Sequence, residues 1–128
     1  MKSIADINAE IREYLSAAGD DVVITNDFTS WENASAAILI TETRLDYERI
    51  RDLDLTVHRT ISVTAELIGK DLDTINTMID NITDAPEYTG SAVRYPMIET
   101  VSMGSESGDI HTARITLWAE IWDYDDDE

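Results

Sequence analysis

Residues 53–68 carry the pattern that decides the fold: Leu-Asp-Leu-Thr-Val-His-Arg-Thr-Ile-Ser-Val-Thr-Ala-Glu-Leu-Ile. The odd positions are apolar and the even positions are polar through most of this stretch, and Arg59 alone breaks the apolar set. Such alternation is typical of a strand with one buried and one solvated face. Globular strands usually run for about five or six residues, so this one is predicted to reach past its own sheet and meet another surface.

Two shorter strands are predicted before this long one. Residues 22–25 (Val-Val-Ile-Thr) form the first, and residues 36–43 form the second. The run Ala37-Ile38-Leu39-Ile40 is apolar on both faces, which is typical of a central strand. Residues 43–52 are charged and contain neither glycine nor proline, so they are predicted to form a wide loop or a protruding hairpin tip.

Two amphipathic helices are predicted from apolar residues spaced three and four apart. Residues 3–17 form the first, with Ser3 and Asp6 resembling a capping box and Gly19 suited to the left-handed residue that follows a helix. The second begins at an N-cap provided by Asp71 or Asp73 and continues to Ile82.

The C-terminal part predicts a hairpin followed by an acidic tail. Residues 98–103 form one strand, residues 104–108 the turn, and residues 110–122 a long final strand. Helices and strands in this order predict an α+β fold, with a mostly antiparallel sheet and two helices packed on one face. Residues 1–122 are expected to form a single domain, and residues 123–128 (Asp-Tyr-Asp-Asp-Asp-Glu) a frayed tail.

The charge is strongly one-sided. Nine Lys and Arg residues stand against 27 Asp and Glu, which gives a formal net charge of −18. Such a surface repels phosphates, so specific DNA binding is not expected, although DNA could pass along it without sticking. Molar salt would screen the self-repulsion, which suggests a high-salt, halophilic setting. An ordinary acidic protein from ordinary salt is the alternative.

No residue pattern points to catalysis, a cofactor or a metal site. The chain has no cysteine and two histidines, His58 and His111, both expected in strands on the face opposite the main apolar set. A nucleophile needs a base and an orienting group beside it, and no motif in the sequence supplies them. No apolar run approaches the length of a membrane span. We therefore expect no enzyme activity and no membrane partner.

Two groups of residues are candidates for an oligomer interface. The first is the charged tip with Arg44, Tyr47, Arg49 and Arg51, which is either a solvated loop or a contact with a neighbour's acidic surface. The second is an aromatic face on the last strand, covered either by a helix of the same domain or by a partner subunit. Arg59 joins the candidates because it interrupts an apolar face; the aromatic residues are Trp118, Trp122 and Tyr124.

The order of elements resembles the tail terminator proteins of long-tailed viruses, of the lambda minor tail protein U type. The similarity rests on the central strand running into an acid (Ala37 to Glu42), the strand at residues 53–68, the helix at residues 71–82, and residues 102–124. The resemblance implies a non-catalytic virion protein of the tail or neck, assembled in the host cytoplasm. It implies a ring, by resemblance a hexamer, that caps the tail tube, contacts the head-side connector or stopper protein, and lets DNA pass through its lumen.

Two other functions stay open. One is a different neck component, such as a head-tail connector or stopper. The other, from a different class, is a small cytoplasmic ligand-binding or enzymatic domain, for which His58, Arg59 and His111 would have to gather on one sheet.

Overall fold

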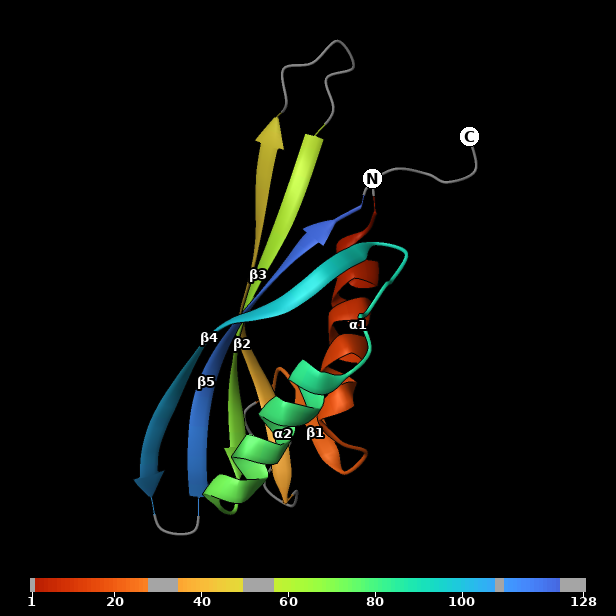
Figure 1. Ribbon diagram of the computed structural model, residues 1–128. Helices are drawn as coiled ribbons and strands as arrows, with labels where there is room; N and C mark the ends of the chain where they lie inside the picture. The colour runs from red at the N-terminus through yellow and green to blue at the C-terminus, as the bar shows by residue number, and fades with distance from the viewer. Residues whose placement is uncertain (1, 28–34, 50–56, 108–109, 123–128) are drawn as a thin grey trace.

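The computed structural model describes residues 2–27, 35–49, 57–107 and 110–122. Its elements in chain order are α1 (Ile4–Leu15), η1 (Ser16–Ala18), β1 (Val22–Thr25), β2 (Ala36–Arg49), β3 (Val57–Gly69), α2 (Leu72–Asp84), β4 (Val93–Ser107) and β5 (Ile110–Ile121). The strands form one sheet in the order β1-β2-β3-β5-β4, in which β1 is parallel to β2 and every other pair is antiparallel. Both helices cover the same face of this sheet (Figure 1), which confirms the predicted α+β architecture.

The core lies between the two helices and the alternating face of the central strands. Ile7, Ile11 and Leu15 of α1 and Ile75, Met78 and Ile82 of α2 are all buried there. The odd-numbered residues from Ile61 to Leu67 of β3 and from Ala113 to Ile121 of β5 meet them from the sheet, as the alternation of residues 53–68 predicts for the described part of that stretch. Fully burying one such aliphatic side chain stabilises the fold by roughly 1.5–3 kcal/mol before entropy is counted.

Both helices begin at the residues that the sequence indicates. The Ser3 hydroxyl accepts a hydrogen bond from the Asp6 backbone N–H at 3.1 Å. Asp71 is the N-cap of α2, and its carboxylate accepts from both the N–H and the hydroxyl of Thr74 at 2.8 Å. Gly19 follows the first helix at φ 153° and ψ 154°, a glycine-only region, rather than in the predicted left-handed conformation.

Two strands extend further than the sequence predicted. β2 continues through the charged residues to Arg49, paired with β3 throughout, so residues 43–49 are strand rather than a wide loop. Residues 50–56, which complete the predicted tip, lie outside the described residues. β4 begins at Val93 and includes Gly104–Ser107, which were predicted as a turn. Tyr95 has a positive φ of 56°, Pro96 follows it, and the pairing of β4 with β5 shifts register at three places. These irregularities interrupt the alternation of apolar and polar residues by which a strand is predicted.

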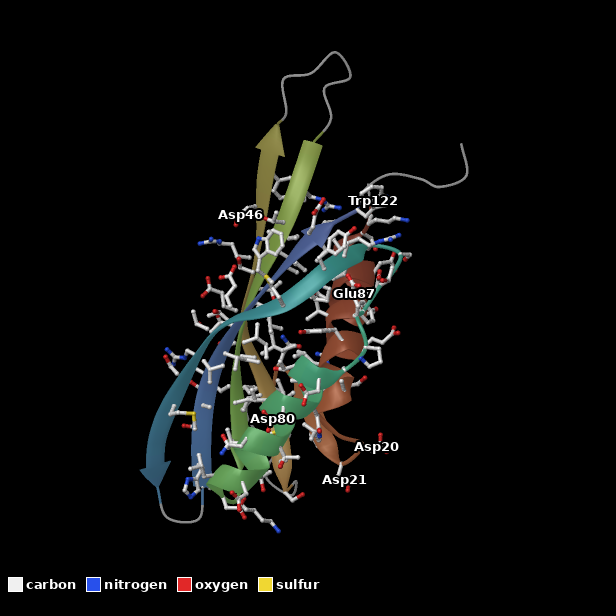
Figure 2. All side chains as sticks on the ribbon, in the orientation of Figure 1. Asp20, Asp21, Asp46, Asp80, Glu87 and Trp122 are labelled. Atoms are coloured by element: carbon white, nitrogen blue, oxygen red, sulfur yellow. The ribbon has the colours of Figure 1, made fainter. Side chains whose placement is uncertain are left out.

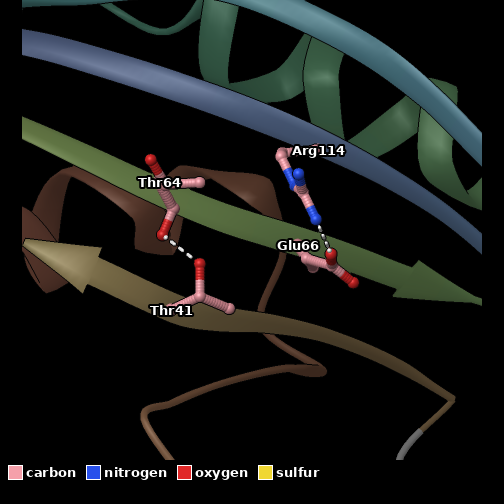
Figure 3. A network of polar contacts seen from close by, with 4 residues as sticks. All are labelled: Thr41, Thr64, Glu66 and Arg114. Carbon is pink, nitrogen blue, oxygen red and sulfur yellow. Dashed lines mark hydrogen bonds and ion pairs between the residues drawn. The ribbon is translucent and has the colours of Figure 1, made fainter.

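A β-bulge interrupts β2 where β1 ends. The register passes from Ile40 opposite Ala65 directly to Glu42 opposite Thr64, so Thr41 has no paired residue on β3. Its hydroxyl donates instead to the Thr64 carbonyl oxygen at 3.1 Å (Figure 3). Before this extra residue the even-numbered positions of β2 face the helices, and after it the odd-numbered positions do. Leu45 and Tyr47 therefore lie on the helix-bearing side of the sheet.

Candidate functional site

The β2–β3 ladder projects beyond the rest of the sheet. β5 ends at Ile121, opposite Arg59, while β2 and β3 stay paired as far as Arg49 and Val57 (Figure 1). The part of the ladder past Arg59 therefore has no β5 neighbour. β3 thus runs past β5, its neighbour on one side, as the long alternating stretch predicts, whereas a contact of its end with another surface stays a prediction.

The positive charges expected at the tip are only partly described. Arg44 is 65% exposed and pairs with Asp46 at 3.3 Å on the sheet face away from the helices, which we call the outer face. Exposed pairs of this kind contribute little to stability. Arg49 ends β2, but its side chain is not described, and Arg51 lies outside the described residues. The interface role of the three arginines stays a prediction.

Arg59 lies inside the monomer. Its side chain is 1% exposed, its guanidinium donates to the Lys2 carbonyl oxygen at 2.7 Å, and it lies over the Tyr47 ring at 5.6 Å. These contacts join the projecting ladder to Lys2, which lies just before the N-cap Ser3 of α1. Arg59 thus positions Tyr47, which is 57% exposed. Arg59 itself is covered within the single chain, and its place at an oligomer interface stays a prediction.

Among the aromatic residues of the last strand, Trp118 lies on a face that no described helix covers. Trp118 is opposite Ser62 of β3 and Met97 of β4 on the outer face, and it is half-buried. Trp122 follows β5, donates its backbone N–H to the Ala92 carbonyl oxygen and lies under the Arg94 guanidinium at 5.6 Å. Tyr124 lies outside the described residues. Contact with a partner subunit remains a prediction for all three.

His111 does not lie near Arg59. His111 pairs with Gly69 and Arg59 pairs with Ile121, at opposite ends of the β3–β5 ladder, so ten residues of strand, about 33 Å, separate them. The register also puts His111 on the same face as Ala113, so its predicted opposite-face position is wrong. It lies beside Asp71, whose pKa is lowered mainly by its hydrogen bonds to Thr74 and less by His111. The side chain of His58 is not described.

An apolar groove of about 370 Å³ lies between the end of α2 and β4. Tyr14, Ile79, Tyr88 and Pro96 are among the residues that line it. Burial raises the pKa of Tyr88 to about 12, with the nearby Glu13 and Glu10 carboxylates and a hydrogen bond to Glu13 adding to the shift. The described lining is mainly apolar, and His111 is not part of it.

Sequence reasoning missed a polar latch between α1 and the start of β4. The Glu10 carboxylate accepts hydrogen bonds from the backbone N–H groups of Ala92 and Val93 at 3.0–3.3 Å and from the Ser91 hydroxyl at 3.3 Å. A Cβ on Gly90 would lie 1.7 Å from a Glu10 oxygen, so glycine makes the approach possible. The partners are more than 80 residues apart, and no local pattern announces such a contact.

Acidic side chains are spread over the surface rather than collected into a metal centre. Figure 2 labels Asp46 on the projecting ladder, Asp20 and Asp21 beyond α1, and Asp80 on α2. Within the described residues, no three His, Asp or Glu side chains form a group that could hold a metal ion. Neither helix in that part of the chain is long and apolar enough to span a bilayer.

The same fold occurs in a chain of the solved structure described as "Virion of native gene transfer agent (GTA) particle". That chain belongs to a virion particle. The match covers 91% of the present chain and 92% of the virion chain, with a TM-score of 0.61 and 9% sequence identity. No protein-family model and no curated protein sequence matches. The likeness therefore rests on the fold.

Proposed function

We propose that this chain is a virion structural protein that acts as a tail terminator, a ring that caps the tail tube and joins it to the head-side connector or stopper. The observation that carries the proposal is the shared fold across nearly the whole length of a chain from a gene transfer agent virion. The match spans both chains almost completely, so it concerns the whole architecture rather than one common motif.

Three features of the chain support a role in assembly without chemistry. His111 lies at the opposite end of the β3–β5 ladder from Arg59 and does not line the apolar groove, so the described side chains bring no histidine together with Arg59. The β2–β3 ladder extends past the core and exposes Tyr47 and Arg44. A formal charge of −18 per copy suits a conduit through which DNA moves without binding.

The charge also bears on the conditions of assembly. Every copy that joins a ring brings the same strong negative charge, so assembly needs counterions or high salt. We propose a halophilic host on this ground. The hexameric state comes from the family resemblance alone.

A tube-capping assay tests the function. Tail-tube subunits of the same virus are polymerised with and without the purified chain in 2 M KCl, and tube lengths are measured by negative-stain electron microscopy. A terminator stops elongation and leaves a ring at one tube end. Tubes that grow equally long in its presence contradict the proposal. Rings that bind the head-side connector but leave tube growth unchanged would instead identify another neck component.

A further inference from the structure

The apolar groove between the end of α2 and β4 leaves apolar side chains open to water. Met97 and Val101, which both line it, are 53% and 43% exposed, and Ile98 between them is half-buried. Tyr14 and Tyr88 also line it and meet edge to face, with ring centroids 6.0 Å apart. Its volume of about 370 Å³ lies within the range of about 300–1,000 Å³ that is typical of binding pockets. The groove therefore has room for apolar side chains of a partner.

Exposed apolar side chains are concentrated on β4, the strand that borders this groove. Of the eight large apolar residues that are exposed in the described part of the chain, four belong to β4: Tyr95, Met97, Val101 and Met103. Each of the other four lies on a different element. Single exposed apolar residues are normal on a protein surface, whereas a cluster of them marks an interaction site. Two of the four on β4 are methionines, whose flexible side chains adapt to varied partners.

The surroundings of the groove are strongly acidic. Residues 71–113, which supply most of its lining, contain eight Asp and Glu residues, and Arg94 is their only Lys or Arg. Glu87 is the one charged residue in the lining, and Glu13 hydrogen-bonds to Tyr88 at the same groove. An apolar surface with carboxylates beside it favours a partner that brings both apolar side chains and positive charge.

Charge also distinguishes between the occupants that this groove could take. The chain's own tail, residues 123–128, carries five carboxylates and no Lys or Arg, and a second copy brings a net charge of −18. Like charge opposes both. A segment with apolar side chains between lysines or arginines would instead place its cations beside Glu87 and Glu13. Partly buried charge pairs are screened by salt less than exposed pairs are, so part of this preference persists in high salt.

We infer that the groove between α2 and β4 is the docking site for a segment of a partner protein in which apolar side chains lie between basic residues. The apolar side chains enter the groove beside Val101, and the basic residues pair with Glu87 and Glu13. In assigning this segment to a tail-tube or connector protein the inference rests on the proposed function, whereas the binding chemistry stands without it.

A peptide titration followed by nuclear magnetic resonance tests the inference. The first probe is Lys-Lys-Leu-Phe-Leu-Lys-Lys, the second has glutamate in place of every lysine, and the third, Lys-Lys-Ser-Gly-Ser-Lys-Lys, keeps the charge without the apolar residues. Spectra of the full chain are recorded at the lowest KCl concentration at which circular dichroism shows it folded. The first peptide should shift amide signals of the groove within residues 79–88 and 96–101, and it should bind about tenfold more tightly than either of the others.

Two variants with matched controls separate the apolar contribution from the ionic one. Val101→Ser should weaken binding of the first peptide about fivefold, whereas Leu72→Ser, an exposed position at the other end of α2, should leave it unchanged. Glu87→Lys should weaken it about tenfold. Asp21→Lys changes the net charge equally at an exposed position well apart from Glu87 (Figure 2), and it should have a much smaller effect. Circular dichroism confirms that each variant folds.

Other occupants would give different results. Equal binding of the glutamate peptide would overturn the choice of a basic partner, and identical diffuse shifts with the Ser-Gly-Ser peptide would show attraction to the acidic surface alone. Groove signals that move in Tyr124→Ala without any peptide would place the chain's own tail there. An assembled mass that falls in Val101→Ser, measured by light scattering, would place a second copy there. Each of these results overturns the inference.

The tube-capping assay fails or succeeds separately from this titration. Normal capping by a chain that binds none of the peptides would overturn the groove inference alone and leave the terminator proposal standing. Binding of the first peptide at the groove by a chain that leaves tube growth unchanged would overturn the terminator proposal and leave the groove as a docking site for a basic partner.

Discussion

The two halves of β2 differ in burial and in pairing. Ala36–Ile40 is buried throughout and pairs with β1 as far as Leu39 and with β3, whereas Thr41–Tyr47 is almost wholly exposed and, among the described residues, pairs with β3 alone. One continuous strand thus passes from the interior of the domain to its surface at a single bulge. The difference teaches that one strand can serve two environments, because the first half contributes side chains to the core and the second leaves a backbone edge open.

The largest expected effect breaks the buried half. Ile38 is 0% exposed, so Ile38→Ala should lower the free energy of unfolding by about 2–5 kcal/mol through lost burial and a residual cavity. The matched change Thr43→Ala, in the exposed half, should cost less than about 1 kcal/mol. Urea denaturation at a concentration where light scattering shows monomer measures both. Similar costs at the two positions would remove the distinction between the halves.

The second prediction concerns the latch between Glu10 of α1 and the start of β4. Glu10→Ala removes the acceptor of two N–H groups belonging to buried residues, and it should cost about 1–3 kcal/mol in the same titration. Asn8→Ala, an exposed position on the same helix, is the control and should be near neutral. An unchanged urea midpoint for Glu10→Ala would contradict this prediction, because it would mean that water satisfies the two N–H groups with no loss of free energy of unfolding.

The third prediction concerns the exposed acidic surface rather than the core. The melting temperature should rise from 0.1 M to 2 M KCl, because the screening length falls from about 10 Å to below about 3 Å. Asp20→Asn/Asp21→Asn removes two negative charges and should reduce this dependence on salt. Equal melting temperatures at both salt concentrations would rule out self-repulsion as a limit on stability.

The smallest effect is confined to alkaline pH. The folded chain raises the pKa of Tyr88 from 10.0 to about 12, so the native state holds this proton more tightly than the unfolded chain does. The stability that Tyr88 contributes is complete below pH 10 and is lost as the pH rises from about 10 to about 12. Tyr88→Phe should remove this part of the decline in melting temperature; identical pH profiles for the two proteins would contradict it.

The sequence predicted those elements whose signal is local. The alternation of residues 53–68 predicted β3, and the spacing of apolar residues with Ser3 and Asp71 predicted both helices and their starts. For the charged half of β2 the sequence left a wide loop and a protruding hairpin tip open, because a strand edge exposed to water tolerates the same residues as a loop does; the paired strand at residues 43–49 agrees with the second.

The candidate site was less predictable for a different reason. Exposure of Tyr47 and Arg44 could be inferred from the charged run, but the burial of Arg59 depends on the Lys2 carbonyl, 57 positions away. The Glu10 latch likewise forms only when α1 meets the start of β4, more than 80 positions along the chain. Such contacts depend on how segments far apart in the sequence align with one another, and no local sequence pattern encodes that alignment.

The unpaired residue Thr41 has a consequence for how this molecule could change. Loss of that single codon would join Ile40, opposite Ala65, directly to Glu42, opposite Thr64, in a regular ladder. Every β2 position from Glu42 onward would keep its partner on β3 and its side of the sheet, so Tyr47 and Leu45 would stay on the helix-bearing side. Thr41 is therefore a residue that β2 could lose while its exposed half still presented the same side chains on each face.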